Sequence, residues 1–195
     1  METAYYSRPT RFLHFGLALT VTFQLAISLV MQARAHQGVP PGAFAHGAFE
    51  AHRFVGLAAV AIVVLHWLWS LRPHMDGGIG HLFPWAGADR ARVMTDVRGL
   101  LRGRVPDSGP RGGLAGAIHG LGLLAVTAMA VSGTVLFVAF PEAGPVPAAA
   151  HNAAEVHSAI ANLVWAYWFG HVGMALLHHL TGHDTLRRIF SLGGG

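Results

Sequence analysis

Histidine is the residue type in this sequence with the most chemistry to offer, because 14 of the 195 residues are histidines. Imidazole is the commonest metal-ligating side chain and also carries protons near neutral pH. The chain has no cysteine, which excludes disulfides, thiolate-bound iron–sulfur clusters and covalent haem attachment through a C-x-x-C-H motif. All 13 basic residues are arginines, which excludes Walker-type and Schiff-base lysines. The composition therefore points to imidazole ligands for a metal or a haem.

His157 and His171 have a spacing that places two ligands on one side of a helix. They are 14 residues apart, and at about 100° per residue this separation falls about 40° short of four full turns. At a rise of about 1.5 Å per residue, the two imidazoles would lie about 21 Å apart along the axis. Two ligand levels on one helix are what a pair of stacked haems in the core of a helical bundle requires.

The elements that carry these histidines are long apolar stretches. Charged residues make up only 11% of the chain, against about 25% in an ordinary soluble domain. Four stretches reach the length of about 20 helical residues that a bilayer requires, namely 12–31, 54–71, 114–140 and 158–180. None alternates with a period of two, which argues against a β-barrel. We expect an all-α integral membrane protein, a single domain over residues 1–195 built as a four-helix bundle.

The first stretch is longer than the apolar segment of a secretory signal peptide, so we expect it to remain as a span. Arginine placement then predicts the orientation. Eleven of the 13 arginines lie in the N-terminal tail, in the loop between the second and third spans, or in the C-terminal tail. The positive-inside rule places these three regions in the cytoplasm and the other two loops on the outer side of the membrane.

The cytoplasmic loop contains a second helical pattern. Residues 89–104 carry Val93, Val97, Leu100 and Leu101 at helical spacing, with arginines between them. This pattern predicts a short amphipathic helix on the inner membrane surface, with its arginines toward anionic lipid. Membrane lipid is therefore the expected partner of the basic stretch, and nucleic acid is not.

The predicted orientation pairs the histidines by depth. The second span enters from outside, so His52 lies at the outer level with His157, and the first span starts inside, so His14 lies at the inner level with His171. Two bis-histidine haem sites follow from this pairing. A rival inner ligand is His66, which is 14 residues after His52, and it would place both haems between the second and fourth spans.

The other histidines fall into two groups. Toward the inner side lie His119, His178 and His179, which we interpret as candidates for proton transfer at a quinone site, or for interfacial and propionate contacts in the case of the last two. Solvated side chains are expected for the histidines of loops and tails, which are His36, His46, His74, His81, His151 and His183.

Short motifs in a fixed order connect most of this chain to a known family. They are Tyr6-Ser-Arg, Leu13-His14-Phe15, His52-Arg-Phe-Val-Gly56, Ser132-Gly133, the stretch from His157 to His171-Val-Gly-Met-Ala-Leu-Leu-His178-His179-Leu, and Asp184-Thr-Leu-Arg-Arg. In these motifs the chain resembles the bacterial cytochrome b561 family. That family consists of four-span dihaem membrane cytochromes, and its members include superoxide oxidase.

The resemblance implies two b-type haems, one ligated by His14 and His171 and the other by His52 and His157, and so favours His14 over His66. It also implies electron transfer between the quinone pool and a donor or acceptor on the periplasmic side. In the superoxide oxidase-like members the donor is superoxide. The presence of His66 and the length of the loop over residues 72–113 depart from the family pattern.

Two other functions are open on the sequence alone. A cytochrome b anchor subunit that links a dehydrogenase or hydrogenase to quinone would use the same haems and would dock a redox partner protein on the arginine-rich loop. A histidine-based transporter for Zn²⁺ or Ni²⁺ would place carboxylates along its path. The four predicted spans contain no Asp or Glu, which disfavours the transporter.

Overall fold

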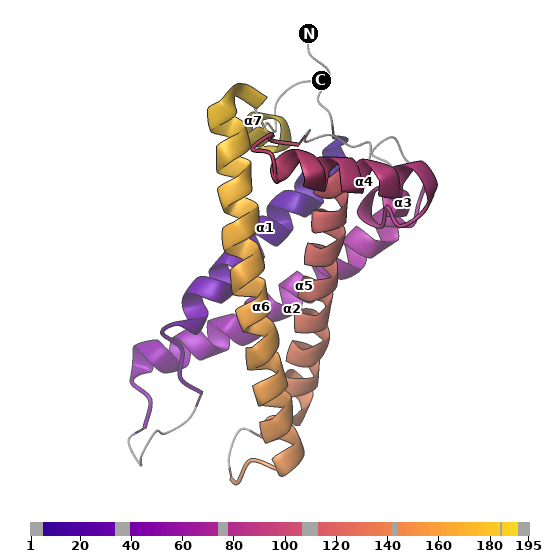
Figure 1. Ribbon diagram of the computed structural model, residues 1–195. Helices are drawn as coiled ribbons and strands as arrows, with labels where there is room; N and C mark the ends of the chain where they lie inside the picture. The colour runs from indigo at the N-terminus through magenta and orange to yellow at the C-terminus, as the bar shows by residue number, and fades with distance from the viewer. Residues whose placement is uncertain are drawn as a thin grey trace. The chain divides into compact units, whose positions relative to one another are not determined.

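The computed structural model describes residues 6–33, 40–73, 78–106, 113–141, 144–183 and 185–190. Figure 1 labels its helices along the chain. They are α1 (Arg8–Ser28), α2 (Ala43–Ser70), α3 (Gly78–Leu82), α4 (Gly87–Leu100), α5 (Gly113–Ala139), α6 (Ala148–His178), the π-helical turn η1 (His179–His183) and α7 (Thr185–Phe190). Every regular element in these ranges is helical, which confirms the predicted all-α class.

Four of these helices are long and apolar enough to cross a membrane, as the sequence predicts. They are α1, α2, α5, and α6 with its extension to Gly182. Their most apolar windows have a mean hydropathy of 1.2 to 2.2. Large apolar side chains such as Leu19, Leu163 and Phe169 are 60 to 63% exposed, which suits helices that face lipid rather than water.

The helices α2 and α6 begin earlier than the predicted spans. The second begins at Ala43 rather than residue 54, and the fourth at Ala148 rather than residue 158. Both added segments contain charged side chains that a hydropathy window leaves out but that pair within the helix. Arg53 lies 3.1 Å from Glu50 on α2, and the ring of His151 lies 3.3 Å from the carboxylate of Glu155 on α6. Pairs three and four residues apart support a helix.

The first span ends earlier than predicted, at Ser28 rather than residue 31. The Ser28 hydroxyl donates to the carbonyl of Leu25 at 2.7 Å. Beyond it the chain tightens into a turn, because the N–H groups of Leu29 and Val30 donate to carbonyls three residues back. A last turn of this kind is common where a helix ends.

The helix predicted over residues 89–104 is present as α4, but it ends at Leu100. Gly103 has a φ of +72°, which ends the helix because glycine adopts this left-handed conformation without strain. The N–H of Arg104 donates to Gly99 and that of Gly103 to Leu100, both at 2.9 Å. This is a Schellman motif. The location of α4 on a membrane surface stays a prediction.

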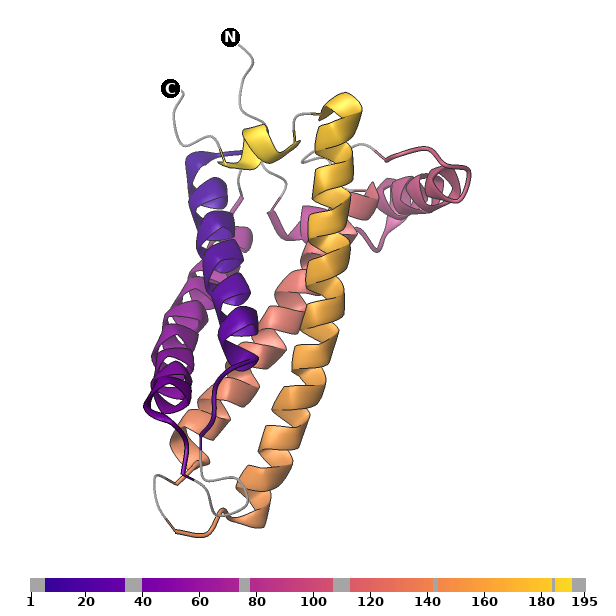
Figure 2. The same cartoon turned by 90° about the vertical axis from the view of Figure 1, so that its left-hand side faces the viewer.

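Contacts divide the chain into two compact units. Unit 1 comprises residues within 1–15, 65–124 and 166–195, and unit 2 comprises residues 16–64 and 125–165. Each of the four long helices contributes a segment to each unit. In unit 2 the segments of α1 and α2 lie side by side in both views (Figures 1 and 2). The buried apolar residues of this unit are Leu25, Ala48, Val63, Ala150 and Val164.

Unit 1 is built around the first half of α5, which carries four buried glycines, Gly113, Gly116, Gly120 and Gly122. A Cβ at Gly116 would meet the backbone carbonyl of His81, and a Cβ at Gly120 that of Leu82. The short helix α3 therefore packs directly against the backbone of α5. The same unit holds α4, whose Asp96 carboxylate accepts a hydrogen bond from the N–H of Leu114 at 2.9 Å, in the first turn of α5.

Candidate metal and cofactor sites

His52 of α2 and His157 of α6 face each other in unit 2. Their ring centroids are 6.3 Å apart and their planes are nearly perpendicular, at 87°. Two imidazole nitrogens on opposite sides of one metal ion, at about 2 Å each, are about 4 Å apart, and each ring centre lies about 1 Å farther out. The observed separation would leave room for a single metal ion between the two rings.

A hydrogen bond fixes the orientation of the His157 ring. Nδ1 of His157 lies 2.8 Å from Oγ of Ser132 on α5. When the Ser132 hydroxyl donates to the carbonyl of Ala128, at 2.9 Å, its oxygen is available to accept the Nδ1–H of His157. This assignment leaves the lone pair on Nε2, which is the state that a metal-ligating histidine requires.

The other side of the pair is arranged around Gln24 of α1. The Gln24 amide donates to the backbone carbonyl of His52 at 2.9 Å, and Gly56 leaves room for it, since a Cβ there would lie 2.9 Å from the amide nitrogen. Nδ1 of His52 is buried and has no hydrogen-bond partner among the described residues. Burying an imidazole nitrogen without a partner is costly, which is consistent with a site built to receive a further group.

A large cavity adjoins this pair within unit 2. Its volume is about 970 Å³, near the upper end of the range of about 300–1,000 Å³ for cofactor and ligand sites. His52 and His157 line it among mainly apolar side chains, and so do Gly56 and Gly133. A Cβ at Gly133 would come within 3.2 Å of Cε1 of His157. The absence of side chains at these glycines helps to keep the space beside the imidazoles open.

Arg53 is a cation on the wall of the same cavity. Its guanidinium lies 4.9 Å from the centre of the Phe137 ring and 3.1 Å from a carboxylate oxygen of Glu50. These contacts hold the charged group at the cavity wall. A cation in this place is suited to an acidic substituent on a bound cofactor.

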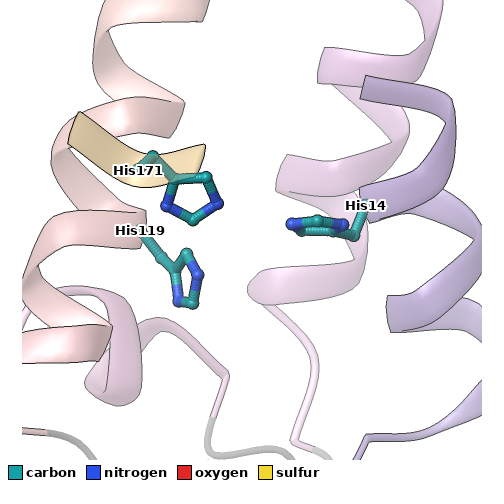
Figure 3. A group of neighbouring side chains, drawn as sticks. All are labelled: His14, His119 and His171. Carbon is teal, nitrogen blue, oxygen red and sulfur yellow. The ribbon is translucent and has the colours of Figure 1, made fainter. Parts of the chain in front are cut away.

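Three histidines converge in unit 1. His14 of α1 faces His119 of α5 and His171 of α6, and the imidazoles point toward one another (Figure 3). A ligand atom from each ring lies within 4.8 Å of the other two. The ring centroid of His14 lies 6.1 Å from that of His171 and 6.3 Å from that of His119. The ring centroids of His119 and His171 are 5.2 Å apart.

Aromatic side chains hold the three-histidine cluster (His14, His119 and His171) in place. The ring of Tyr167 stacks on His171, with centroids 5.3 Å apart and planes 12° apart. Phe190 of α7 packs edge-on against His14 at 5.9 Å. Nδ1 of His14 is buried and has no hydrogen-bond partner among the described residues. The cluster thus has positioned rings and an unsatisfied nitrogen, as the first pair does.

The structure brings His119 next to His14 and His171, a grouping that the sequence did not predict. The role of His119 in proton transfer at a quinone site stays a prediction. Tyr167 was missed altogether, although it precedes His171 by four residues and so shares its helix face.

His81 corrects the expectation that the loop histidines are solvated. Its side chain is only 7% exposed, and its ring centroid lies 6.3 Å from that of His119. The cause is the packing of α3 against the backbone of α5, for which the Gly116 to Gly120 spacing was an available signal. His46 and His151 are exposed, as expected. His36, His74 and the side chain of His183 lie outside the described residues.

The remaining candidates lie outside the group of three. Nδ1 of His66 lies 3.2 Å from Oγ of Ser70, one turn along α2. Among the described residues, the group whose ligand atoms lie within 4.8 Å contains His14 and not His66. Near the end of α6, His178 is 6% exposed and therefore buried, whereas His179 in the π-helical turn is exposed.

Comparison with known families gives one result. A family model described as prokaryotic cytochrome b561 matches residues 5–192. The match covers nearly the whole chain, including all of its histidines. No curated protein and no solved structure gave a significant match.

Proposed function

Because the chain belongs to the prokaryotic cytochrome b561 family, we propose that it binds two b-type haems, one in each unit, and passes electrons between quinone and a donor or acceptor on the periplasmic side. The family makes the chain a b-type haem cytochrome that transfers electrons in a bacterial membrane. The number of haems, their ligands and the two redox partners are our proposal.

The observation that carries the proposal is the geometry of His52 and His157. Their centroid distance of 6.3 Å suits a shared iron, and they line a cavity of about 970 Å³. Ser132 holds His157 with Nε2 available for ligation. In unit 1, His14 and His171 have a centroid distance of 6.1 Å, which also suits a shared iron.

A haem bound at either site supplies one-electron chemistry, and the protein sets its potential through the axial ligands, burial and hydrogen bonds. Two histidines holding each iron would leave it no ligand position for oxygen. The unit 2 cavity has mainly apolar walls that suit a porphyrin ring, and Arg53 on its wall would provide a cation for a haem propionate. We assign quinone to the cytoplasmic end of the chain, where His178 and His179 are candidates to carry the protons that quinone reduction takes up.

Superoxide is the periplasmic donor that we propose to test first. Two superoxide ions would each lose one electron and leave as O₂, and one quinone would take up the two electrons and two protons to give the quinol. This balance needs no further oxidant. This reaction suits a cytochrome that moves single electrons from a one-electron donor to a two-electron acceptor.

The first experiment counts the haems in the purified protein by the pyridine haemochrome method, together with a reduced-minus-oxidised spectrum. We expect two b-type haems per chain with low-spin bands. His157→Ala should lose one haem, whereas His151→Ala should keep both, because His151 is an exposed histidine on the same helix. Protein that holds no haem despite adequate haem supply would refute the proposal.

The anchor-subunit alternative uses the same haems and differs only in its donor. It is favoured by α4, which has no buried residue and leaves Arg90, Arg92 and Arg98 exposed as a basic surface. Superoxide-dependent reduction of a quinone by the protein alone would support the first function. Electron delivery only in the presence of a co-purifying dehydrogenase or hydrogenase would support the second.

A further inference from the structure

The two histidines that we propose as axial ligands in unit 2 differ in the surroundings of their second ring nitrogen. Nδ1 of His157 lies 2.8 Å from Oγ of Ser132. Nδ1 of His52 is buried and has no hydrogen-bond partner among the described residues. A histidine that ligates a metal through Nε2 carries a hydrogen on Nδ1, and that hydrogen is almost always donated to an acceptor. His52 therefore needs an acceptor that its direct contacts do not supply.

Gln24 of α1 carries the complementary group. Its amide nitrogen Nε2 donates to the backbone carbonyl of His52 on α2 at 2.9 Å. Its amide oxygen Oε1 is buried and, within the described part of the chain, has no hydrogen-bond partner. Both residues line the unit 2 cavity. One contacting pair of residues thus contains a buried ring nitrogen and a buried amide oxygen that are both unsatisfied, and a buried polar group in that state is costly.

We propose that Gln24 is the positioning residue for His52. Its Nε2 holds the backbone of the ligand, and its Oε1 takes the Nδ1–H of the ligated imidazole through one bridging water. The inference rests on the proposed haem in unit 2. A buried water needs two to four polar partners, and Nδ1 of His52 and Oε1 of Gln24 are two of them. The bridge would give His52 the kind of acceptor that Ser132 offers to His157.

This arrangement has a consequence for the potential of the haem. An acceptor on Nδ1–H makes an imidazole a stronger electron donor to the iron, which stabilises the oxidised haem more than the reduced haem. Loss of the acceptor should therefore raise the midpoint potential of that haem. A tenfold loss of preference for the oxidised form corresponds to about 59 mV in a one-electron couple. The haem proposed for unit 1 should keep its potential, because Gln24 belongs to unit 2.

The test is a redox titration of both haems in the full-length protein and in three variants. Gln24→Met removes both amide groups at a similar side-chain length, and we expect one midpoint potential to rise. Gln24→Glu keeps an acceptor oxygen whether its carboxyl group is neutral or ionised, so we expect that potential to stay or to fall. Thr20→Val is the control, because the Thr20 hydroxyl donates within its own helix, to the carbonyl of Gly16 at 2.7 Å. Both potentials should stay in the control.

A second readout separates an electronic effect from a change in ring orientation. The electron paramagnetic resonance signal of a low-spin bis-histidine haem depends on the angle between the two ring planes, which is 87° for His52 and His157. A raised potential with an unchanged signal in Gln24→Met would support the inference. A shifted signal would show that Gln24 only fixes the orientation of the ring and would overturn it, as would equal potentials in Gln24→Met and Gln24→Glu.

Infrared spectroscopy tests the bridging water. The reduced-minus-oxidised difference spectrum of the unaltered protein should contain a water O–H band that shifts in H₂¹⁸O and is missing from Gln24→Met. A spectrum of the unaltered protein without such a band would overturn the bridge.

Haem counts separate this inference from the proposed function. Should Gln24→Met lose a haem, retention of both haems in Gln24→Glu would support the acceptor role, and the same loss in Gln24→Glu would overturn it. Fewer than two haems in the unaltered protein would contradict the proposed function itself.

Discussion

At the scale of single residues, small polar groups decide what each histidine can do. Oγ of Ser132 lies 2.8 Å from Nδ1 of His157 and 2.9 Å from the carbonyl oxygen of Ala128. In the tautomer in which Nδ1 donates to Ser132, Nε2 keeps its lone pair. On the opposite helix, the Gln24 amide binds the backbone of His52 and not its ring. One imidazole of the pair is therefore oriented by its ring nitrogen and the other by the helix that carries it.

Replacing Ser132 by alanine should loosen haem binding in unit 2. Loss of a hydrogen-bonding partner of a ligating histidine typically costs about 10- to 100-fold in metal affinity, so we expect faster haem transfer to apomyoglobin from one of the two sites. Thr134→Ala is the matched control on the wall of the same cavity, because the Thr134 hydroxyl donates to the carbonyl of Ala130 in its own helix. Equal transfer rates in the two variants would show that Ser132 does not orient a haem ligand.

At the scale of elements, unit 1 depends on close approach to α5. Gly116 and Gly120 let α3 contact the helix backbone, and this contact buries His81 beside the cluster. Glycines four residues apart commonly allow two helices to pack closely. Here they seat a five-residue helix from a loop, and the loop thereby becomes part of the site.

Gly120→Ala should displace α3, because the new Cβ would meet the carbonyl of Leu82. Overpacking of this kind costs about 1–3 kcal/mol. We expect a lower midpoint for thermal loss of haem absorbance and faster tryptic cleavage at Arg90. The control is Gly170→Ala on α6, where nothing lies within 4 Å of the added carbon. A cleavage rate equal to that of the control would contradict the packing argument.

Asp96 joins α4 to the start of α5, and its removal should weaken unit 1. Its carboxylate accepts from the N–H of Leu114, one of the helix-start donors that have no partner within the helix. Loss of such a cap costs about 1 kcal/mol, so Asp96→Ala should lower the thermal midpoint of the detergent-solubilised holoprotein. Asp96→Asn keeps an accepting oxygen and should stay near the original midpoint. Equal losses in both variants would point to charge rather than capping.

At the scale of the whole molecule, four apolar helices and the distribution of arginines govern insertion into the membrane. The helices are long enough to span, and the arginine-rich loop that contains α4 connects the second span to the third. The absence of acidic residues from the predicted spans leaves imidazoles as the polar groups most able to bind a cofactor there. Ionisable residues within spans commonly mark such functional sites.

The predicted orientation places both termini in the cytoplasm. A C-terminal fusion to green fluorescent protein should therefore fluoresce, and a C-terminal fusion to alkaline phosphatase should be inactive, because phosphatase folds only after export. Phosphatase inserted after Pro145, in the loop that precedes α6, should be active. Active phosphatase at the C-terminus would reverse the orientation and with it the assignment of quinone to the cytoplasmic end.

The features that the sequence determined by itself are those that depend on residues close together in the chain. Helix periodicity put His157 and His171 on one face of a single helix, and apolar length identified the four spans, because both properties depend only on residues near one another in the chain. The helix starts at Ala43 and Ala148 were missed, since the first turns of both helices contain polar and charged residues that a hydropathy window excludes.

Tertiary structure decided which side chains complete the sites. The rotation of α5 about its axis brings His119 to His14 and His171, and the packing of α3 on bare glycine backbone turns His81 from an expected surface residue into a buried one. The stacking of Tyr167 on His171 and the hydrogen bond from His157 to Ser132 likewise depend on side chains of a folded unit. The phase of one helix relative to another is set by which small residues permit close approach, and helical periodicity within one segment carries no information about it.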